Sequence, residues 1–122
     1  MPFVDLVSVD DYVSLWYWTN TPSNTVGTFD PDKPTLVFLH PAGLDSTWMQ
    51  SQVEDPRLFC EYNMIMFDTR ITGRSECKFN GKHDLWVTAA DLAQSFYHLH
   101  LPPAHIFAPD IYTQAALRFA TL

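Results

Sequence analysis

Residues 36–48 read LVFLHPAGLDSTW, and the order of residue types here predicts the first unit of the fold. It opens with a short, continuous apolar run, which is typical of a strand buried on both faces, as in a parallel sheet. A histidine, a proline and a glycine then predict a loop. After the loop, Asp45 or Ser46 can cap a helix that carries Met49 and Val53. The stretch therefore predicts a strand, a loop and a helix in succession.

Two further runs of the same character follow along the chain. NMIMF at 63–67 and HIFA at 105–108 are both short and apolar, which predicts two more buried strands. Between them, Thr88-x-x-Asp91 has the pattern of a capping box that opens a helix, and residues 111–122 predict another helix. Alternation of strands and helices predicts a parallel sheet with helices on its faces. We expect the first buried strand to lie between the other two.

An antiparallel hairpin is predicted before the first buried strand. Residues 3–9 and 12–18 are rich in aromatic and β-branched side chains, and the pair Asp10-Asp11 between them suits a tight turn. The predicted fold class is therefore α/β, with an N-terminal antiparallel hairpin followed by parallel strands with flanking helices. We expect residues 1–122 to form a single incomplete domain, open to self-association through an unpaired sheet edge.

Composition and charge limit the classes of partner. Hydrophobic residues make up 47% of the chain and charged residues 17%, which is typical of a globular domain. The net charge of -7 disfavours nucleic acids and anionic membranes. No stretch has the character of a signal peptide or of a membrane span. Cys60 and Cys77 form no motif and are expected to be reduced thiols, so we expect a cytoplasmic protein.

Sites in open parallel sheets form beyond the carboxyl ends of the strands. In the second loop, Asp68 and Arg70 are expected to hold the turn by hydrogen bonds and a salt bridge. His98 and His100 point apart on a helix, so neither a metal nor a cofactor is expected. His105 and Asp110 lie at opposite ends of the third buried strand, about 16 Å apart, so their side chains cannot act together.

Three segments, LVFLHPAGLDSTW, FDTRITGRS at 67–75 and HIFAPDIYTQAALRFA at 105–120, resemble the α/β-hydrolase superfamily. In that family the first segment carries a loop that supplies an oxyanion donor, the second is an Asp-x-Arg-x-x-Gly-x-Ser turn, and the third is the strand, nucleophile elbow and helix. The resemblance covers nearly the whole chain from Thr35 onward. It implies a partial α/β-hydrolase fold.

The resemblance also assigns roles to individual residues. Asp110 takes the position of the nucleophile, and His40, Ala42 and Ile111 fall at the oxyanion and substrate site. The donor in the first loop must be Ala42 or later, because the preceding proline has no N–H. One departure is Tyr112, which puts a large ring where the elbow of the family keeps a glycine.

An aspartate nucleophile points to epoxide hydrolases and haloalkane dehalogenases, because a carboxylate is ionised at pH 7 and attacks carbon without a base. Hydrolysis of a small organic ester or epoxide is the activity that the resemblance implies. The catalytic histidine and acid of the family are absent from these residues, so we expect this chain to be inactive. The alternative is a non-catalytic relative that binds a small molecule or a partner. Asp110 can equally cap the next helix, and His40 can face Asp110 or bond to its own loop.

Overall fold

The structure of the protein is a computed structural model that describes residues 3–6, 13–22, 24–41, 44–70, 72–77 and 84–121. The turn predicted at Asp10-Asp11 lies outside these residues. In chain order the elements are β1 (Phe3–Leu6), β2 (Val13–Thr19), η1 (Val26–Thr28), β3 (Thr35–Leu39), η2 (Ser46–Met49), α1 (Gln50–Val53), α2 (Pro56–Phe59), β4 (Asn63–Phe67), β5 (Glu76–Cys77), α3 (Leu85–Leu99), β6 (Ala104–Phe107) and α4 (Tyr112–Ala120).

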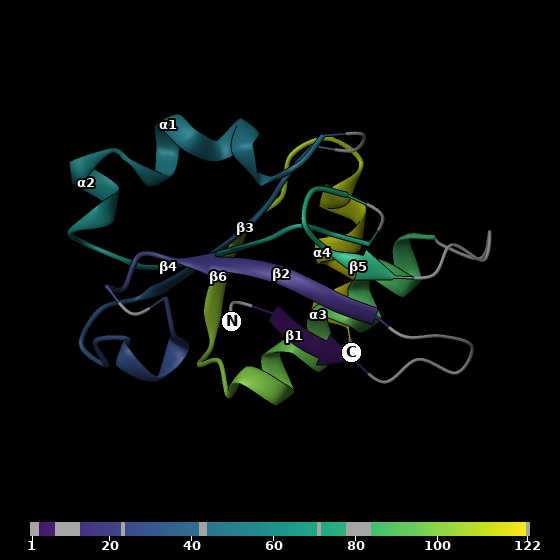
Figure 1. Ribbon diagram of the computed structural model, residues 1–122, viewed down its shortest axis with the longest axis horizontal. Helices are drawn as coiled ribbons and strands as arrows, with labels where there is room; N and C mark the ends of the chain where they lie inside the picture. The colour runs from purple at the N-terminus through teal and green to yellow at the C-terminus, as the bar shows by residue number, and fades with distance from the viewer. Residues whose placement is uncertain are drawn as a thin grey trace.

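The strands form one mixed sheet in the order β1-β2-β4-β3-β6, and β5 pairs with β2 (Figure 1). β1 and β2 are antiparallel, and β2 is also antiparallel to β4. β3 runs parallel to both β4 and β6, so that Leu36 lies opposite Met64 on one side and His105 on the other. The predicted hairpin and the central place of the first buried strand are therefore confirmed.

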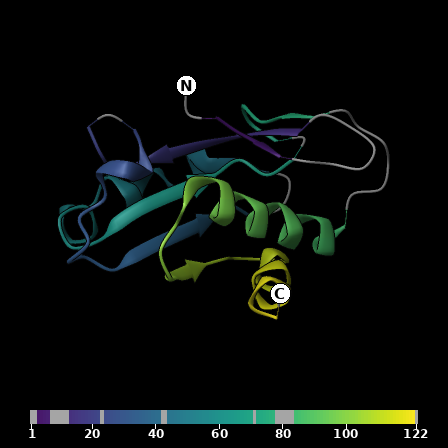
Figure 2. The same ribbon diagram turned by 90° about the horizontal axis from the view of Figure 1, so that it is seen from below.

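α3 and α4 cover one face of the sheet (Figure 2). Alternate strand residues face these helices, because successive side chains of a strand point to opposite faces. This larger core joins the helix residues Leu92 and Ala115 to the strand residues Val4, Leu6, Val13, Leu15, Tyr17, Val37, Leu39, Ile65 and Phe67.

The segment from η2 to α2 covers part of the opposite face (Figure 1). Its buried side chains Met49 and Val53 pack against Phe38, Met64 and Met66 of the two central strands. Asp45 begins this segment and accepts a hydrogen bond from the backbone N–H of Thr47 at 3.0 Å, as expected of a helix cap. The sheet therefore has helices on both faces, which is why its central strands read as continuous apolar runs.

The predicted start of the long helix is wrong. α3 begins at Leu85, where the carboxylate of Asp84 accepts a hydrogen bond from the backbone N–H of Val87 at 2.9 Å. Thr88 and Asp91 are buried inside the helix. Asp91 thus lies inside the helix, where its carboxylate pairs with Arg70 instead of closing a capping box. The short elements α2 and β5 were not predicted.

Candidate active site

His40 follows β3 directly and is almost fully buried, with 1% of its surface exposed. Its Nδ1 lies 2.8 Å from the carbonyl oxygen of Pro41, and its Nε2 accepts the backbone N–H of Thr69 at 3.1 Å. The hydroxyl of Thr72 lies 3.2 Å from the same Nε2. This pattern assigns the proton to Nδ1, which donates to Pro41, and leaves Nε2 as an acceptor. His40 therefore ties two loops together, in agreement with the structural alternative.

Tyr112 connects the first turn of α4 to the same cluster. Its hydroxyl lies 3.0 Å from the hydroxyl of Thr69, and its buried ring meets the ring of His40 edge to face, with centroids 5.6 Å apart. The ring of Tyr112 thus lies between the turn before α4 and the other two loops. All three loops meet at the carboxyl ends of β4, β3 and β6, because these neighbouring strands are parallel. Sequence reasoning missed this network, because its hydroxyl partners are far apart along the chain.

Asp110 lies in the turn between β6 and α4 and adopts a left-handed backbone conformation, with φ at 59°. The residue is exposed, and no hydrogen bond or ion pair from the described residues engages its carboxylate. The N-cap position of α4 belongs to Ile111, and no side chain caps this helix. The carbonyl of Asp110 instead accepts the backbone N–H of Thr113 at 3.2 Å. The alternative that Asp110 acts as a side-chain cap is therefore wrong.

A hollow of about 220 Å³ lies beside this turn. It is lined by Asp84, Leu85 and Thr88 from the start of α3, and by Ile111 and Tyr112 from the start of α4. Ile111 is about half exposed, so it presents an apolar surface next to Asp110. Ala42, the expected oxyanion donor, lies outside the described residues. The hollow has room for a small organic molecule only.

The turn after β4 is held by the buried carboxylate of Asp68. It accepts the backbone N–H of Ser46 at 2.8 Å and that of Arg74 at 2.9 Å. Arg70 does not form the expected salt bridge with Asp68. It pairs with Asp91 of α3, because the oxygens of Asp68 are already engaged by the backbone. Asp68 thus holds the turn by hydrogen bonds, as expected, whereas the salt bridge of Arg70 is made with Asp91.

The described residues contain no group of three or more histidine, cysteine, aspartate or glutamate side chains placed to hold a metal ion. His98 and His105 are exposed, and His100 ends α3 in a left-handed conformation. No helix among the described residues is both long and apolar enough to cross a membrane.

Several solved structures share this arrangement of strands and helices. An alpha/beta hydrolase enzyme from a Medee basin deep-sea metagenome matches 96% of this chain with a TM-score of 0.73 and 18% identity. The chain has an α/β-hydrolase fold. An esterase from Thermogutta terrifontis matches 99% of it, with a TM-score of 0.76 and 21% identity. A haloalkane dehalogenase variant from Bradyrhizobium elkanii matches 97%, with a TM-score of 0.69 and 18% identity.

The chain spans 38% of the length of the metagenome enzyme, 41% of the esterase and 35% of the dehalogenase variant. It corresponds to part of the fold, with a mixed sheet, an antiparallel hairpin and parallel strands flanked by helices. Neither a protein-family model nor a curated protein sequence matches it.

Proposed function

We propose that Asp110 is the attacking carboxylate of a hydrolase that acts on a small organic substrate. The observation that carries this proposal is a strained residue without a structural role for its side chain. An aspartate at φ 59° is costly compared with glycine, yet its carboxylate is exposed and engaged by none of the described residues. Strain of this kind is typical of functional turns. An α/β-hydrolase fold holds its nucleophile on such a turn between a strand and a helix.

The chemistry of a carboxylate favours an epoxide over an ester as the substrate. Attack by an oxygen of Asp110 on a ring carbon breaks the carbon–oxygen bond, and the ring oxygen takes a proton from water. The product is a hydroxyalkyl ester of Asp110. Attack on the acyl carbon of an ester would instead give an anhydride, which is a much less stable intermediate. A haloalkane dehalogenase is among the proteins of the same fold, and displacement of a halide is the same kind of attack on a saturated carbon.

Release of the product requires a base that activates water. Among the described residues, His40 is the histidine that lies at the carboxyl ends of the parallel strands, where the turn of Asp110 also lies. Its two ring nitrogens are engaged by Pro41, Thr69 and Thr72. We therefore expect this chain to form the ester once and to retain it, so that a covalent adduct, and not turnover, is the expected signal.

Intact-protein mass spectrometry after incubation with styrene oxide tests the proposal. We expect one adduct per chain, located at Asp110 by peptide mapping and absent in Asp110→Asn. Asp84→Asn is the matched control, because Asp84 is also an exposed carboxylate and lines the hollow beside the turn of Asp110, while asparagine keeps its helix cap. An adduct that is spread over both carboxylates would contradict a specific nucleophile.

A second candidate is a non-catalytic protein of the same fold. The packing of Tyr112 against His40 favours this candidate, because a large buried ring occupies the place of the glycine of the elbow. Suppose that the folded chain forms no adduct with styrene oxide, while a thiol-reactive reagent still labels exposed Cys60. The hypothesis of a non-catalytic protein then replaces that of an enzyme.

A further inference from the structure

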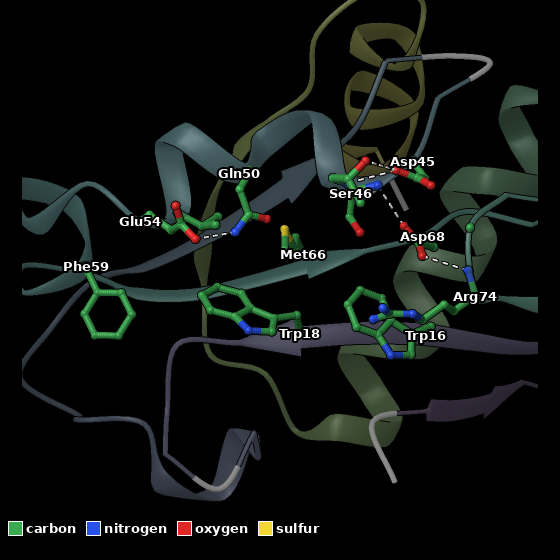
Figure 3. A pocket seen from close by; sticks show the side chains of 13 residues that line it. Trp16, Trp18, Asp45, Ser46, Gln50, Glu54, Phe59, Met66, Asp68 and Arg74 are labelled. Carbon is green, nitrogen blue, oxygen red and sulfur yellow. Dashed lines mark hydrogen bonds between the residues drawn. The ribbon is translucent and has the colours of Figure 1, made fainter.

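A second, larger hollow lies on the sheet face opposite α3 and α4. The residues that line it are distant from Asp110 in the sequence. Its volume is about 530 Å³, and it opens between β2 and the segment from η2 to α2 (Figure 3). Trp16, Trp18 and Met66 form its floor, and side chains from η2 and α1 form the opposite wall. None of the residues that line the hollow beside Asp110 lines this one, so the two hollows are separate.

One end of the hollow already contains a cation over an aromatic ring. The guanidinium carbon of Arg74 lies 4.8 Å from the ring centroid of Trp16. Such a contact is attractive because the face of an indole carries partial negative charge. The chain itself therefore shows that the floor of this hollow accepts a positive group.

Trp18 lies two residues further along β2, and its side chain points to the same face of the sheet. It is only partly buried. Among the described residues, the arginines that lie over indole rings are Arg74 over Trp16 and Arg118 over Trp86, and none lies over Trp18. Figure 3 shows Gln50 and Glu54 on the wall above Trp18, with Phe59 beside it. The carboxylate of Glu54 accepts a hydrogen bond from the side-chain amide of Gln50, which holds it at this wall.

The charges around the hollow favour a positive ligand. Three carboxylates, those of Asp45, Glu54 and Asp68, line it with a single guanidinium, that of Arg74. The carboxylate of Asp68 is buried and used by backbone N–H groups, but Glu54 is exposed and accessible to a ligand. An anion would meet an excess of negative charge here, whereas a cation gains from Glu54 and from the indole.

We propose that Trp18 and Glu54 bind the positive head of a small organic amine or quaternary ammonium compound. The head sits over Trp18 as the guanidinium of Arg74 sits over Trp16. Its apolar body packs on Met66 and Phe59.

Choline is a suitable probe, and the indole N–H signals of the four tryptophans report its place of binding in NMR spectra of the full chain. We expect choline to shift the signal of Trp18 in a saturable way, with no matching shift of Trp86 on α3. Its uncharged analogue, with a tert-butyl group in place of trimethylammonium, should bind about tenfold more weakly, because only the charged head gains from the ring and the carboxylate. Equal binding of the two compounds would overturn the proposal.

Substitutions separate the two contacts. Trp18→Phe should keep choline binding within about threefold, because an aromatic face remains, whereas Trp18→Leu should weaken it about tenfold. Glu54→Gln should weaken binding about threefold at low salt, and Glu61→Gln, an exposed glutamate outside the hollow, should not change it. Thermal unfolding of each variant confirms that it is folded. Binding that survives both Trp18→Leu and Glu54→Gln in folded protein would refute the site.

Discussion

Arg70 and Asp91 form a bidentate salt bridge that joins the turn after β4 to the middle of α3. The Nε and Nη2 atoms of Arg70 lie 2.6 Å and 2.9 Å from the two carboxylate oxygens of Asp91. The two side chains are 11% and 5% exposed, so the pair is largely withdrawn from solvent. A buried pair of this geometry fixes how the helix sits on the sheet, because separating two charges that are withdrawn from water costs free energy.

Asp91→Ala should therefore lower the free energy of unfolding by about 3–5 kcal/mol, because it leaves the guanidinium of Arg70 without this carboxylate in a buried place. Arg57→Met breaks an exposed salt bridge of the described residues, the one with Asp55, in which the side chain of Arg57 is 90% exposed. That change should cost far less than Asp91→Ala, because water and salt screen an exposed ion pair. Urea denaturation of the two variants and the wild type measures the difference. Similar losses for both would show that the buried pair has no special weight.

Gly73 is required by the carboxylate of Asp68. The glycine has φ at 48°, and a Cβ at this position would clash with the side chain of Asp68. Gly73→Ala should lower the free energy of unfolding by at least about 2 kcal/mol, because it adds strain and displaces the acceptor of two backbone N–H groups. Gly27→Ala is the matched control, since a Cβ there meets no atom within 4 Å. Denaturation midpoints that fall equally for both variants would contradict this account.

The parallel strands and their order could be predicted because they depend on local apolar runs and on general rules of connection. The position of Asp110 between β6 and α4 could be predicted for the same reason, since the strand and the helix that flank it are continuous in sequence. The start of α3 was predicted too late, at Thr88 instead of Asp84, because a threonine followed by an acid three residues later fits a capping box, whereas this acid pairs with a residue of another loop. That partner, Arg70, is 21 residues from Asp91.

The network around His40 was also beyond local prediction. It requires Thr69 and Tyr112, which are 29 and 43 residues away from their partners in the network. Only a folded sheet brings the three loops together. The sequence indicated that these loops lie together at the carboxyl ends of the parallel strands, but not that a tyrosine ring would lie between them.

Asp45 should make stability depend on pH. The pKa of this carboxyl lies below its ordinary value because the hydroxyl and the backbone N–H of Thr47 donate hydrogen bonds to the carboxylate. Because this pKa is lower in the folded state, the stabilisation is fully present above the pKa of the unfolded state, which is about 4. It is lost as the pH falls through the pKa of the folded state. Thermal unfolding followed from neutral to acidic pH should show this loss in the wild type.

Asp45→Asn separates the charge from the cap. Asparagine still caps η2 but does not titrate, so the difference in Tm between wild type and variant should shrink as the pH falls. Thr47→Val removes one of the two donors and should reduce the pH dependence without abolishing it. An identical pH profile in the wild type and in Asp45→Asn would exclude Asp45 as the source.

Asp110→Gly tests whether the turn is kept for function at the expense of stability. Glycine adopts the left-handed conformation without strain, and no contact of the described residues is lost, so the free energy of unfolding should rise by about 0.5–1 kcal/mol. His100→Gly, at φ 54° at the end of α3, should give a similar gain. Only Asp110→Gly should abolish the styrene oxide adduct. A loss of stability in Asp110→Gly would mean that the carboxylate has a structural role.

The outer edge of β6 should allow the chain to associate with a second copy. β6 lies at one end of the sheet and pairs with β3 alone among the described strands. An unpaired strand edge is a template for another strand, and the exposed ring of Phe107 adds apolar surface beside it. We expect the apparent mass in sedimentation to rise with protein concentration.

Phe107→Lys should shift that rise to higher concentrations, because a charge on an edge strand disfavours pairing with a second copy. Leu117→Lys, on the exposed face of α4, is the matched control and should leave association unchanged if the strand edge is the contact. If Leu117→Lys prevents association and Phe107→Lys does not, the copies meet through the helix and not through the sheet. A mass that stays monomeric at every concentration in the wild type would show that the open edge of β6 is not enough to hold two copies together.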